Sequence, residues 1–355
     1  MALPQGIATD VSEAEGALRA FDAEVSAAFG SDTIAFGPMS SVLLRSESTS
    51  SSNIENLTVG ARQLALAELN LSQSPNARLV ASNVLAMNTA LELADRLTSD
   101  TLLDMHRALL IGDPRLSHEA GRYRTQPVWI RGSAFGPVNA VHVAPPHDLV
   151  PDLVDDTLQF LNRVDAPVIA QIAIAHAQFE TIHPFVDGNG RTGRALVQAA
   201  LRNKQVTRSI TAPVSAGLLH SQESYFAALT AFRAGDAAPI VAAFVAASAV
   251  CRKQGHDLVQ ELRAIIAALR ERIAPASKRA FAHQVIPFLV EQPVITSAAL
   301  AARFDIAPTS AIHTIDLLAQ YGVVSEVTKN RRNRVWQQND VLEALDRFAA
   351  SIVRR

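Results

Sequence analysis

The segment His183-Pro-Phe-Val-Asp-Gly-Asn-Gly-Arg-Thr-Gly-Arg194 constrains this chain more than any other. Within twelve residues it combines a histidine, a carboxylate, an amide, three glycines and two arginines. The glycines leave backbone N–H groups uncovered, and the apolar residues that follow at 195–201 predict a helix that starts here. A glycine-rich loop at a helix N-terminus binds anions, so the segment predicts a site for a phosphate group.

The side chains of this segment suit the chemistry of a nucleotide polyphosphate. Asp187 is placed to hold a divalent cation, and Asn189 to donate its amide to a phosphate oxygen. Arg191 and Arg194 are three residues apart and share a helical face. Histidine has a reference pKa of about 6.5, so His183 is suited to accept a proton from an attacking hydroxyl at neutral pH. Each residue alone is equally typical of an ordinary turn, but the combination predicts a transferase.

The same segment resembles the active-site motif His-x-Phe-x-(Asp/Glu)-Gly-Asn-Gly-Arg-x-x-Arg of the Fic (filamentation induced by cAMP) family. This resemblance implies a mainly α fold, with a Fic helical core and a β-hairpin flap. It also implies the transfer of AMP from ATP to a Ser, Thr or Tyr hydroxyl of a target protein, although a minority of the family uses other donors. Relatives that transfer a phosphate carry Lys before the first arginine and lack the second, whereas this chain has Gly190 and Arg194.

The resemblance assigns a role to each residue of the motif. His183 is the base that activates the target hydroxyl, Asp187 binds Mg²⁺, and Arg194 grips the γ-phosphate. Phe185 anchors the loop in the core. Contacts to the nucleotide are implied for Gly188, Asn189, Gly190, Arg191 and Arg194 and, further along the chain, for Tyr225 in an adenine pocket. For Tyr225 the alternative is a core aromatic, because it lies at helical spacing.

A second element lies at Ser51-Ser52-Asn53-Ile54-Glu55-Asn56. From the residues alone, it is typical of a serine-capped start of a helix with an early glutamate. It also resembles the inhibitory-helix motif Ser/Thr-x-x-x-Glu-Gly/Asn of Fic proteins that carry this motif before the core. The resemblance implies that Glu55 pairs with Arg194, and a guanidinium bound bidentately by a carboxylate cannot bind a γ-phosphate. We therefore expect an autoinhibited enzyme. In some relatives this glutamate also positions the water that removes AMP.

Alternating apolar and polar residues flank a turn rich in glycine and proline, and they predict a β-hairpin. The first strand contains Val128, Trp129 and Ile130, and the second lies within 140–146. The resemblance implies that this hairpin is the flap, which holds a target segment by β-strand addition. The alternative is a plain surface hairpin.

Composition bears on the class of protein. A net charge of −2 over 355 residues does not suit a generally polycationic nucleic-acid binder. Cys251 is the only cysteine, which excludes a disulfide within the chain. The N-terminus lacks the basic and apolar regions of a leader, and the longest apolar run, 237–251, is shorter than the roughly 20 residues of a membrane span. We therefore expect a cytoplasmic protein without membrane contact.

Abundant alanine and apolar residues repeated at three and four positions predict a mostly helical architecture. The expected helices are residues 12–29, 57–70, 77–97, 99–110, 148–162, 167–181, 191–204, 221–234 and 237–272 and, in the C-terminal part, 281–290, 297–304 and 308–321. The sequence divides into an N-terminal helical region with the inhibitory motif (1–98), a Fic catalytic core (99–272) and a C-terminal domain (275–345).

The C-terminal domain resembles a winged helix-turn-helix domain, because three expected helices are followed by two strands joined by a basic tip. In that tip, Arg331, Arg332 and Arg334 are candidates for contact with DNA. The alternatives are a solvated turn and a protein-docking module. A second function is therefore a DNA-binding regulator whose Fic core senses nucleotides. Homodimers also occur in the family, so a homodimer is a further candidate.

Overall fold

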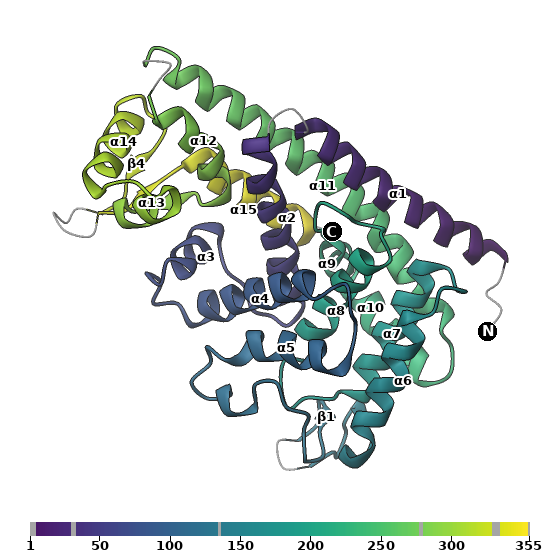
Figure 1. The fold of residues 1–355 in the computed structure, drawn as a ribbon. Helices are drawn as coiled ribbons and strands as arrows, with labels where there is room; N and C mark the ends of the chain where they lie inside the picture. The colour runs from purple at the N-terminus through teal and green to yellow at the C-terminus, as the bar shows by residue number, and fades with distance from the viewer. Residues whose placement is uncertain (1–4, 30–32, 134–135, 277–279, 329–333, 354–355) are drawn as a thin grey trace.

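The computed structural model describes residues 5–29, 33–133, 136–276, 280–328 and 334–353 (Figure 1). The fold is mainly α, as the sequence predicts, with two small sheets in the described part of the chain. The helices are α1 (Gln5–Phe29), α2 (Thr33–Ile54), α3 (Ala61–Glu68), α4 (Pro75–Glu92), α5 (Ser99–Leu110), α6 (Val150–Asn162), α7 (Val168–Ile182), α8 (Asn189–Asn203), α9 (Val214–His220), α10 (Gln222–Arg233), α11 (Ala238–Ile273), α12 (Ala282–Glu291), α13 (Ser297–Phe304), α14 (Pro308–Gln320) and α15 (Asn339–Val353), with short 3-10 turns η1 (Ser117–Glu119) and η2 (His147–Leu149). The strands are β1 (Trp129–Ile130), β2 (His142–Val143), β3 (Val294–Ile295), β4 (Ser325–Glu326) and β5 (Trp336–Gln337).

Helix α8 is central to the larger of the two main hydrophobic cores. Most of its residues are buried, and α4, α5 and α7 pack around it. The small side chains of Ala195, Ala199 and Ala200 let these neighbouring helices come close, and all three are fully buried. The helix whose N-terminus carries the predicted phosphate site is therefore held in place along its length.

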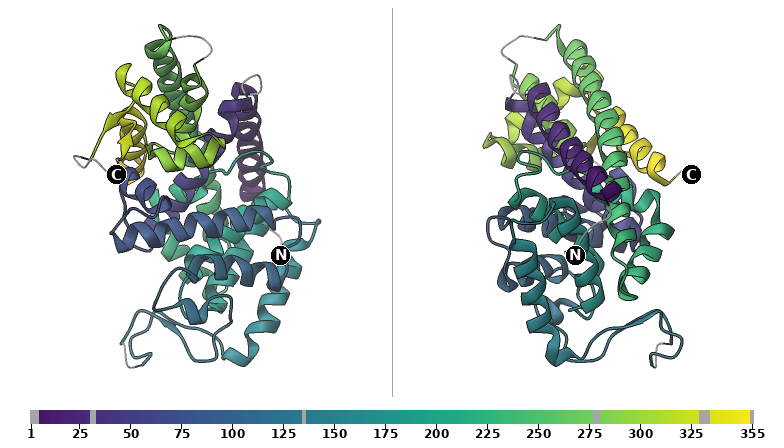
Figure 2. Two further views of the ribbon diagram at one scale, coloured as in Figure 1. Left: turned by 60° about the vertical axis from the view of Figure 1, so that its left-hand side comes forward. Right: turned by 90° about the vertical axis from the view of Figure 1, so that its right-hand side faces the viewer.

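Helix α11 has 36 residues and runs alongside α1 (Figures 1 and 2). Gly255 permits this close approach, since a Cβ there would lie 2.6 Å from a ring carbon of Phe21. Near its start, Ile240 and Val241 pack into the larger core. Further along, Leu258 belongs to the second core, so α11 links the two.

The second core joins helices α12–α14 to a three-stranded antiparallel sheet of order β3-β5-β4. Three helices followed by two strands are the layout that the sequence predicts for this part, and α13 has the predicted bounds. Strand β3 and helix α15 were not predicted. The expected end of the domain at residue 345 falls inside α15, which packs against α11 and α9 through an apolar face that includes Val341, Ala344 and Phe348.

Of the three arginines proposed for DNA contact, only Arg334 lies within the described residues. Its Nε donates to Glu326 Oε1 at 2.8 Å across the hairpin, and its guanidinium lies 4.6 Å from the ring centroid of Trp336. Arg331 and Arg332 lie outside the described residues. The side chain of Arg334 therefore has local partners in this structure.

Helix α2 overturns one expectation. The serine-rich segment at Ser51 was expected from its residues alone to start a helix, but it forms the last turn of α2. The hydroxyls of Ser48 and Ser52 donate to the carbonyls of Leu44 and Ser48, at 2.9 Å in both cases. Serine in a helix is tolerated when its hydroxyl bonds back in this way, and here burial between two cores outweighs the preference of serine for helix starts.

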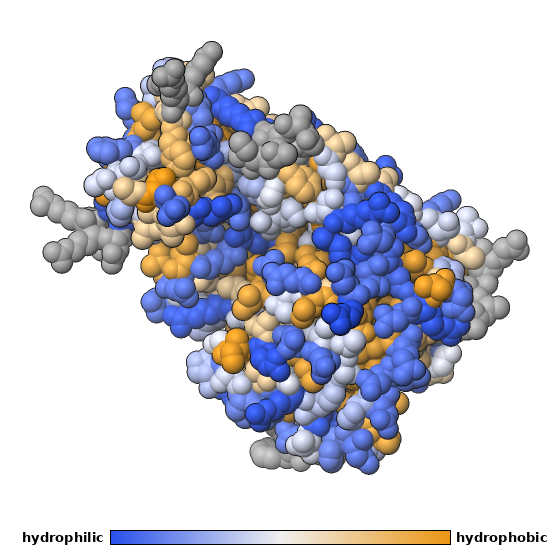
Figure 3. Space-filling view, viewed as in Figure 1, coloured by the Kyte–Doolittle hydropathy of each residue, from blue (hydrophilic) through white to orange (hydrophobic). Residues whose placement is uncertain are grey.

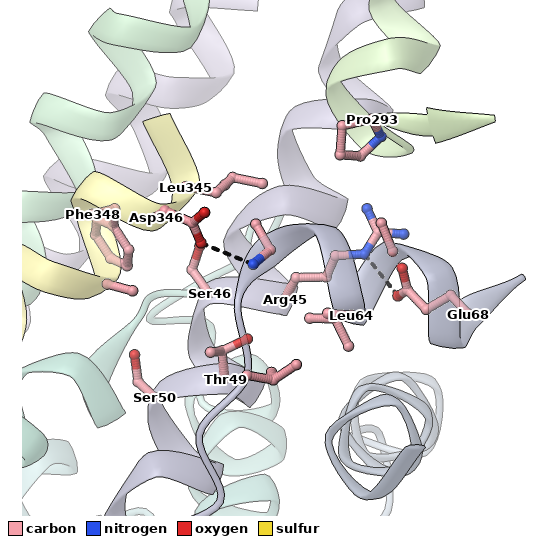
Figure 4. Close-up of a pocket in the computed structure, with 14 residues that line it drawn as sticks. Arg45, Ser46, Thr49, Ser50, Leu64, Glu68, Pro293, Leu345, Asp346 and Phe348 are labelled. Atoms are coloured by element: carbon pink, nitrogen blue, oxygen red, sulfur yellow. Dashed lines mark hydrogen bonds and ion pairs between the residues drawn. The ribbon is translucent and has the colours of Figure 1, made fainter. Parts of the chain in front are cut away.

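The N-terminal and C-terminal parts of the chain meet beside α2 (Figure 4). Arg45 of α2 forms an ion pair with Glu68 of α3 at 2.7 Å and donates to Gln292 at the end of α12. Asp346 of α15 accepts a hydrogen bond from the Ala61 backbone at 2.9 Å. A small cavity of about 40 Å³ lies between these groups. Helix α2 therefore touches the C-terminal unit near its middle and, as described below, the Fic motif at its end.

Polar side chains cover much of the face seen in Figure 3, with apolar residues scattered among them. In the part of the chain that the structure describes, no helix is apolar over a length that would cross a bilayer. The hairpin β1–β2 projects away from the helices (Figure 2).

Candidate active site

The predicted anion loop connects α7 to α8. Helix α7 ends at Ile182 and is followed by His183, whose φ of 51° is left-handed, and α8 begins at Asn189 after Gly188, whose φ is 80°. Such angles are costly for residues other than glycine, so the backbone at His183 needs support from its surroundings. The loop delivers the histidine at one end and uncovered N–H groups at the other.

Asn189 shapes this loop. Its amide oxygen accepts from the backbone N–H of Phe185 at 2.8 Å, and its amide nitrogen donates to the carbonyl of Phe185 at 2.9 Å. Phe185 is fully buried, in agreement with its expected place in the core. Since the amide group of Asn189 is occupied in this way, the phosphate contact expected of it stays a prediction.

Arg194 is held by the end of α2. Its Nε donates to Ser51 Oγ at 2.9 Å, and its Nη2 donates to the Ser51 carbonyl and to Glu55 Oε1, both at 2.8 Å. The Arg194 side chain is 2% exposed and that of Glu55 is 40% exposed. The ion pair engages one carboxylate oxygen rather than two, so the bidentate geometry expected from the sequence is wrong in detail.

The charges of this pair stabilise each other. Desolvation raises the pKa of the Glu55 carboxyl, but the Arg194 charge and hydrogen bond outweigh it and hold the pKa below its usual value. Burial lowers the pKa of Arg194, and the nearby Glu55 carboxylate more than offsets this. Gly190 makes room for the pair, because a Cβ there would lie 2.0 Å from Glu55 Oε1. Both groups are therefore ionised at neutral pH, within a space that only glycine leaves free.

His183 is neutral in this environment. Burial lowers the pKa of its imidazole to about 4. Its Nδ1 is buried and has no hydrogen-bond partner among the described residues. A neutral imidazole is the form that accepts a proton, as the predicted role of a base requires.

Two cavities meet at Glu55. One, of about 380 Å³, is lined by the anion loop, including Asp187 and Gly188. The other, of about 400 Å³, lies toward the flap and is lined by Ile130 and Arg194 among others. Both are also lined by Glu55, His183 and Gly190. The carboxylate of Glu55 therefore sits where the two cavities join.

Asp187 is suited to hold a metal ion only together with ligands from water or a bound nucleotide. Its side chain is 48% exposed, and its Oδ1 accepts from Arg191 at 2.9 Å. Among the described residues, no group of three or more His, Cys, Asp or Glu side chains is arranged to hold a metal. Mg²⁺ commonly takes one or two carboxylates together with waters and substrate phosphates. An accessible carboxylate that lines the cavity at the anion loop fits that pattern.

The anion loop lies within a region that matches a known family. Residues 96–201 match the family described as Fic/DOC. The chain contains a Fic domain. The protein adenylyltransferase fic-1 of Caenorhabditis elegans is 35% identical over 148 residues, which are 41% of this chain and 26% of that protein. A probable protein adenylyltransferase of Aquifex aeolicus is 40% identical over 80 residues, which are 22% of this chain and 23% of that protein. The chain thus spans about a quarter of the length of these curated relatives.

The fold agrees with solved Fic structures. A Fic family protein from Desulfovibrio desulfuricans G20 matches with a TM-score of 0.55 at 22% identity, covering 95% of this chain and 97% of that one. Fic-1 of C. elegans matches with a TM-score of 0.51 at 21% identity, covering 72% of this chain and 74% of that one. These likenesses show that the chain has the fold of Fic proteins.

Tyr225 lines the cavity that lies toward the flap, but the residue is only 1% exposed. Its hydroxyl is bonded to His176 Nε2 at 2.7 Å. The neighbouring Phe226 is 37% exposed and lines the same cavity. Tyr225 thus has the burial of a core aromatic, and its contact with adenine stays a prediction. Phe226 was not chosen as a candidate from the sequence, although it directly follows Tyr225 and is the more exposed of the two aromatic residues.

The predicted hairpin is present beside this cavity. Trp129 pairs with Val143 and Ile130 with His142, and the Val128 carbonyl accepts from the Ala144 N–H at 3.1 Å. His142 Nε2 lies 2.8 Å from the carbonyl of Thr181 in the last turn of α7, and this contact ties the hairpin to the helix that leads into the anion loop. Its proposed use in holding a target stays a prediction.

Sequence reasoning missed two buried titratable groups around the Fic loop. His106 of α5 lies 3.0 Å from the Asp187 carbonyl through Nε2, and its ring stacks on Phe185 with centroids 3.7 Å apart. Glu180 of α7 is 6% exposed and lines the cavity near the flap. Its Oε1 has no hydrogen-bond partner among the described residues, and burial raises the pKa of its carboxyl to about 7. Neither residue lies within the twelve-residue motif.

Proposed function

We propose that this chain is an autoinhibited protein adenylyltransferase, which transfers AMP from ATP to a Ser, Thr or Tyr hydroxyl of a target protein. The observation that carries the proposal is the Glu55–Arg194 ion pair at the junction of two cavities, next to a neutral His183. The adenylyltransferase names of the relatives support the reaction type. The inhibitory role of Glu55 follows from the resemblance of its segment to an inhibitory-helix motif, and the ion pair with Arg194 supports it.

In the proposed reaction, the target hydroxyl attacks the α-phosphorus of ATP. The new O–P bond forms as the bond between the α-phosphorus and the bridging oxygen breaks, and pyrophosphate leaves. The imidazole of His183 takes the proton of the hydroxyl. The N–H groups at Gly188 and Gly190 face the negative charge of the phosphates at the N-terminus of α8. Asp187 would hold Mg²⁺, which supplies positive charge to the phosphates.

Inhibition follows from competition for Arg194. A guanidinium that donates to Glu55 and to Ser51 has few donors left for a γ-phosphate. The Glu55 carboxylate also repels an incoming phosphate at the junction of the cavities. Without the γ-phosphate contact, the α-phosphorus is not turned toward His183. Activity therefore requires Glu55 to leave Arg194, and a Glu55 released in this way is also a candidate for positioning the water that removes AMP.

The test is transfer of label from α-labelled ATP in the presence of Mg²⁺. We would compare the parent, Glu55→Gly, and Glu55→Gly combined with His183→Ala, measuring label in the protein itself and in added candidate proteins. We expect roughly 10- to 100-fold more label with Glu55→Gly, because a charge-assisted hydrogen bond is worth about 1.5–3 kcal/mol. The double variant should lose this gain in label.

A matched reaction with γ-labelled ATP identifies the group that moves. Label from the α-position only supports AMP transfer, whereas label from the γ-position contradicts it in favour of phosphate transfer. If Glu55→Gly binds ATP but transfers no label to itself or to any added protein, the proposal fails and a nucleotide-sensing role is favoured.

A further inference from the structure

Arg124 is a buried cation outside the Fic motif. It is 1% exposed. Its guanidinium makes no ion pair with a carboxylate in the described part of the chain. Its four hydrogen bonds there all go to backbone carbonyls. Burying a charge is unfavourable unless hydrogen bonds satisfy it, so this arrangement requires a precise set of acceptors. The position of those acceptors indicates what the residue does.

Two acceptors belong to the catalytic loop. Nε donates to the His183 carbonyl at 2.8 Å, and Nη2 donates to the Ile182 carbonyl at 3.2 Å. These carbonyls lie at the end of α7, where helix geometry leaves them without intrahelical partners. They also flank the left-handed backbone of His183. Arg124 therefore supports the loop at the residue whose conformation is most costly.

The other two acceptors belong to the two legs of the hairpin β1–β2. Nη1 donates to the Gln126 carbonyl at 3.1 Å, shortly before β1, and Nη2 donates to the Pro145 carbonyl at 2.6 Å, shortly after β2. The backbone N–H of Arg124 donates to Pro184 at 2.9 Å as well. One planar guanidinium thus joins both legs of the hairpin to the catalytic histidine.

Only arginine has the donors for this arrangement. Its five N–H groups lie in a rigid plane and point in several directions at once, whereas lysine offers a single nitrogen on a flexible stem. A lysine at position 124 has the length to reach one of the segments, but it cannot fix the distance between them. The substitution keeps the charge and removes the bridge.

We propose that Arg124 is a positioning residue that sets the flap at a fixed distance from His183, so that a segment seated on the flap presents its hydroxyl to the imidazole. The consequence for transfer rests on the proposed function. The mechanical link between the flap and the catalytic loop does not, and it is tested separately.

The first experiment measures hydrogen exchange of backbone amides in the full chain for the parent, Arg124→Lys and Arg122→Ala. Arg122 is the matched control, because it is an exposed arginine two residues away. The reporting amides are hydrogen-bonded in both segments: Val141 and Ala144 in the hairpin, and His183 and Phe185 in the loop. We expect Arg124→Lys to speed exchange about tenfold in both segments together and Arg122→Ala to leave both unchanged.

Faster exchange in the hairpin alone, or an equal rise throughout α8, would overturn the link. The first outcome would make Arg124 a local brace of the hairpin, and the second would make it a general stabiliser of the fold. Arg124→Gln, which keeps two donors, is the second variant if Arg124→Lys does not fold.

The second experiment repeats the comparison in the Glu55→Gly background, with self-labelling from α-labelled ATP as the readout. We expect Arg124→Lys to lower the maximal labelling rate at least tenfold and to leave the KM for ATP within about twofold, because the phosphate contacts lie on α8. An unchanged rate despite a loosened flap would overturn the positioning role. If Glu55→Gly labels neither itself nor any added protein, the proposed function fails, and the exchange experiment still decides whether Arg124 links the two segments.

Discussion

The anion loop between α7 and α8 is contacted by α2 on one side and by His106 and Arg124 on the other. The two sets of contacts differ in whether a ligand is able to replace them. On the α2 side, Arg194 meets Glu55, whose side chain is 40% exposed and faces two cavities. On the opposite side, His106 and Arg124 are almost fully buried and bond to backbone carbonyls of the loop. A phosphate has the charge to take the place of Glu55, whereas neither His106 nor Arg124 is among the residues that line the two cavities.

Under the proposed function, the contact from α2 regulates the loop, whereas the contacts from His106 and Arg124 support its backbone. The contact with α2 joins residues 139 apart in the chain and uses a single carboxylate oxygen at the end of a helix. Such a contact is broken by moving one element. The contacts from His106 and Arg124 fix the backbone that carries His183 and Asp187, and they are expected to persist in the inhibited and active states alike.

Of the substitutions considered, His106→Ala should have the largest effect on stability, because it removes contacts that no ligand replaces. The Gly121 N–H donates to His106 Nδ1 at 3.0 Å, so the ring proton is on Nε2, which donates to Asp187. Loss of these bonds and of the stack on Phe185 predicts that His106→Ala lowers the free energy of unfolding by about 3 kcal/mol. Urea unfolding with and without ATP and Mg²⁺ checks it, and ATP should not restore the loss beyond its effect on the parent.

Substitution of Glu55 should remove the contact that a phosphate is able to replace, the ion pair with Arg194. Glu55→Gly leaves the buried Arg194 charge without its carboxylate partner while the Ser51 contacts remain, at a cost of about 2 kcal/mol, which is less than for a fully buried pair because Glu55 is partly exposed. The same unfolding measurement should show that ATP restores this loss and that ADP restores less, because ADP lacks the γ-phosphate. Equal restoration by ATP and ADP would contradict the role given to Arg194.

The pH dependence of stability tests whether water reaches the buried carboxyl of Glu180. Burial raises the pKa of its carboxyl to about 7, above the ordinary value of 4.5 for glutamate. A raised pKa means that its contribution to stability is complete below about pH 4.5 and is lost as the pH rises through 7. Between pH 5 and 8 the parent should therefore lose about 1–2 kcal/mol more stability than Glu180→Gln. Parallel unfolding curves over this range would show that water reaches the carboxyl.

The sequence predicted the parts of the site that are local in the chain. The histidine, carboxylate and glycines of the segment from His183 to Arg194 are all close together in the sequence, so its chemistry could be predicted without knowledge of the fold. The hairpin was legible from alternation and turn residues. In both cases, the interacting groups lie within a few residues of one another.

The rest depends on contacts between distant segments. His106 reaches Asp187 across 81 residues, and nothing in the helix that carries it marks it as different from a packed histidine. Helix α2 was missed because serine and threonine have low helix propensity, and only its burial between two cores overrides that preference. Such effects of tertiary packing leave no local pattern.

Ser51 supplies the smallest and most selective test of the replaceable side. Ser51→Ala removes the bond from Arg194 Nε but keeps the carbonyl contact and Glu55. We expect a cost of about 1 kcal/mol and, in the transfer assay, roughly a fivefold rise in labelling. Ser52→Ala is the matched control, because Ser52 is equally buried in the same turn but its hydroxyl bonds to Ser48 and Asn83. If both variants raise labelling equally, the effect comes from loosening α2, and the hydroxyl of Ser51 has no specific part in holding Arg194.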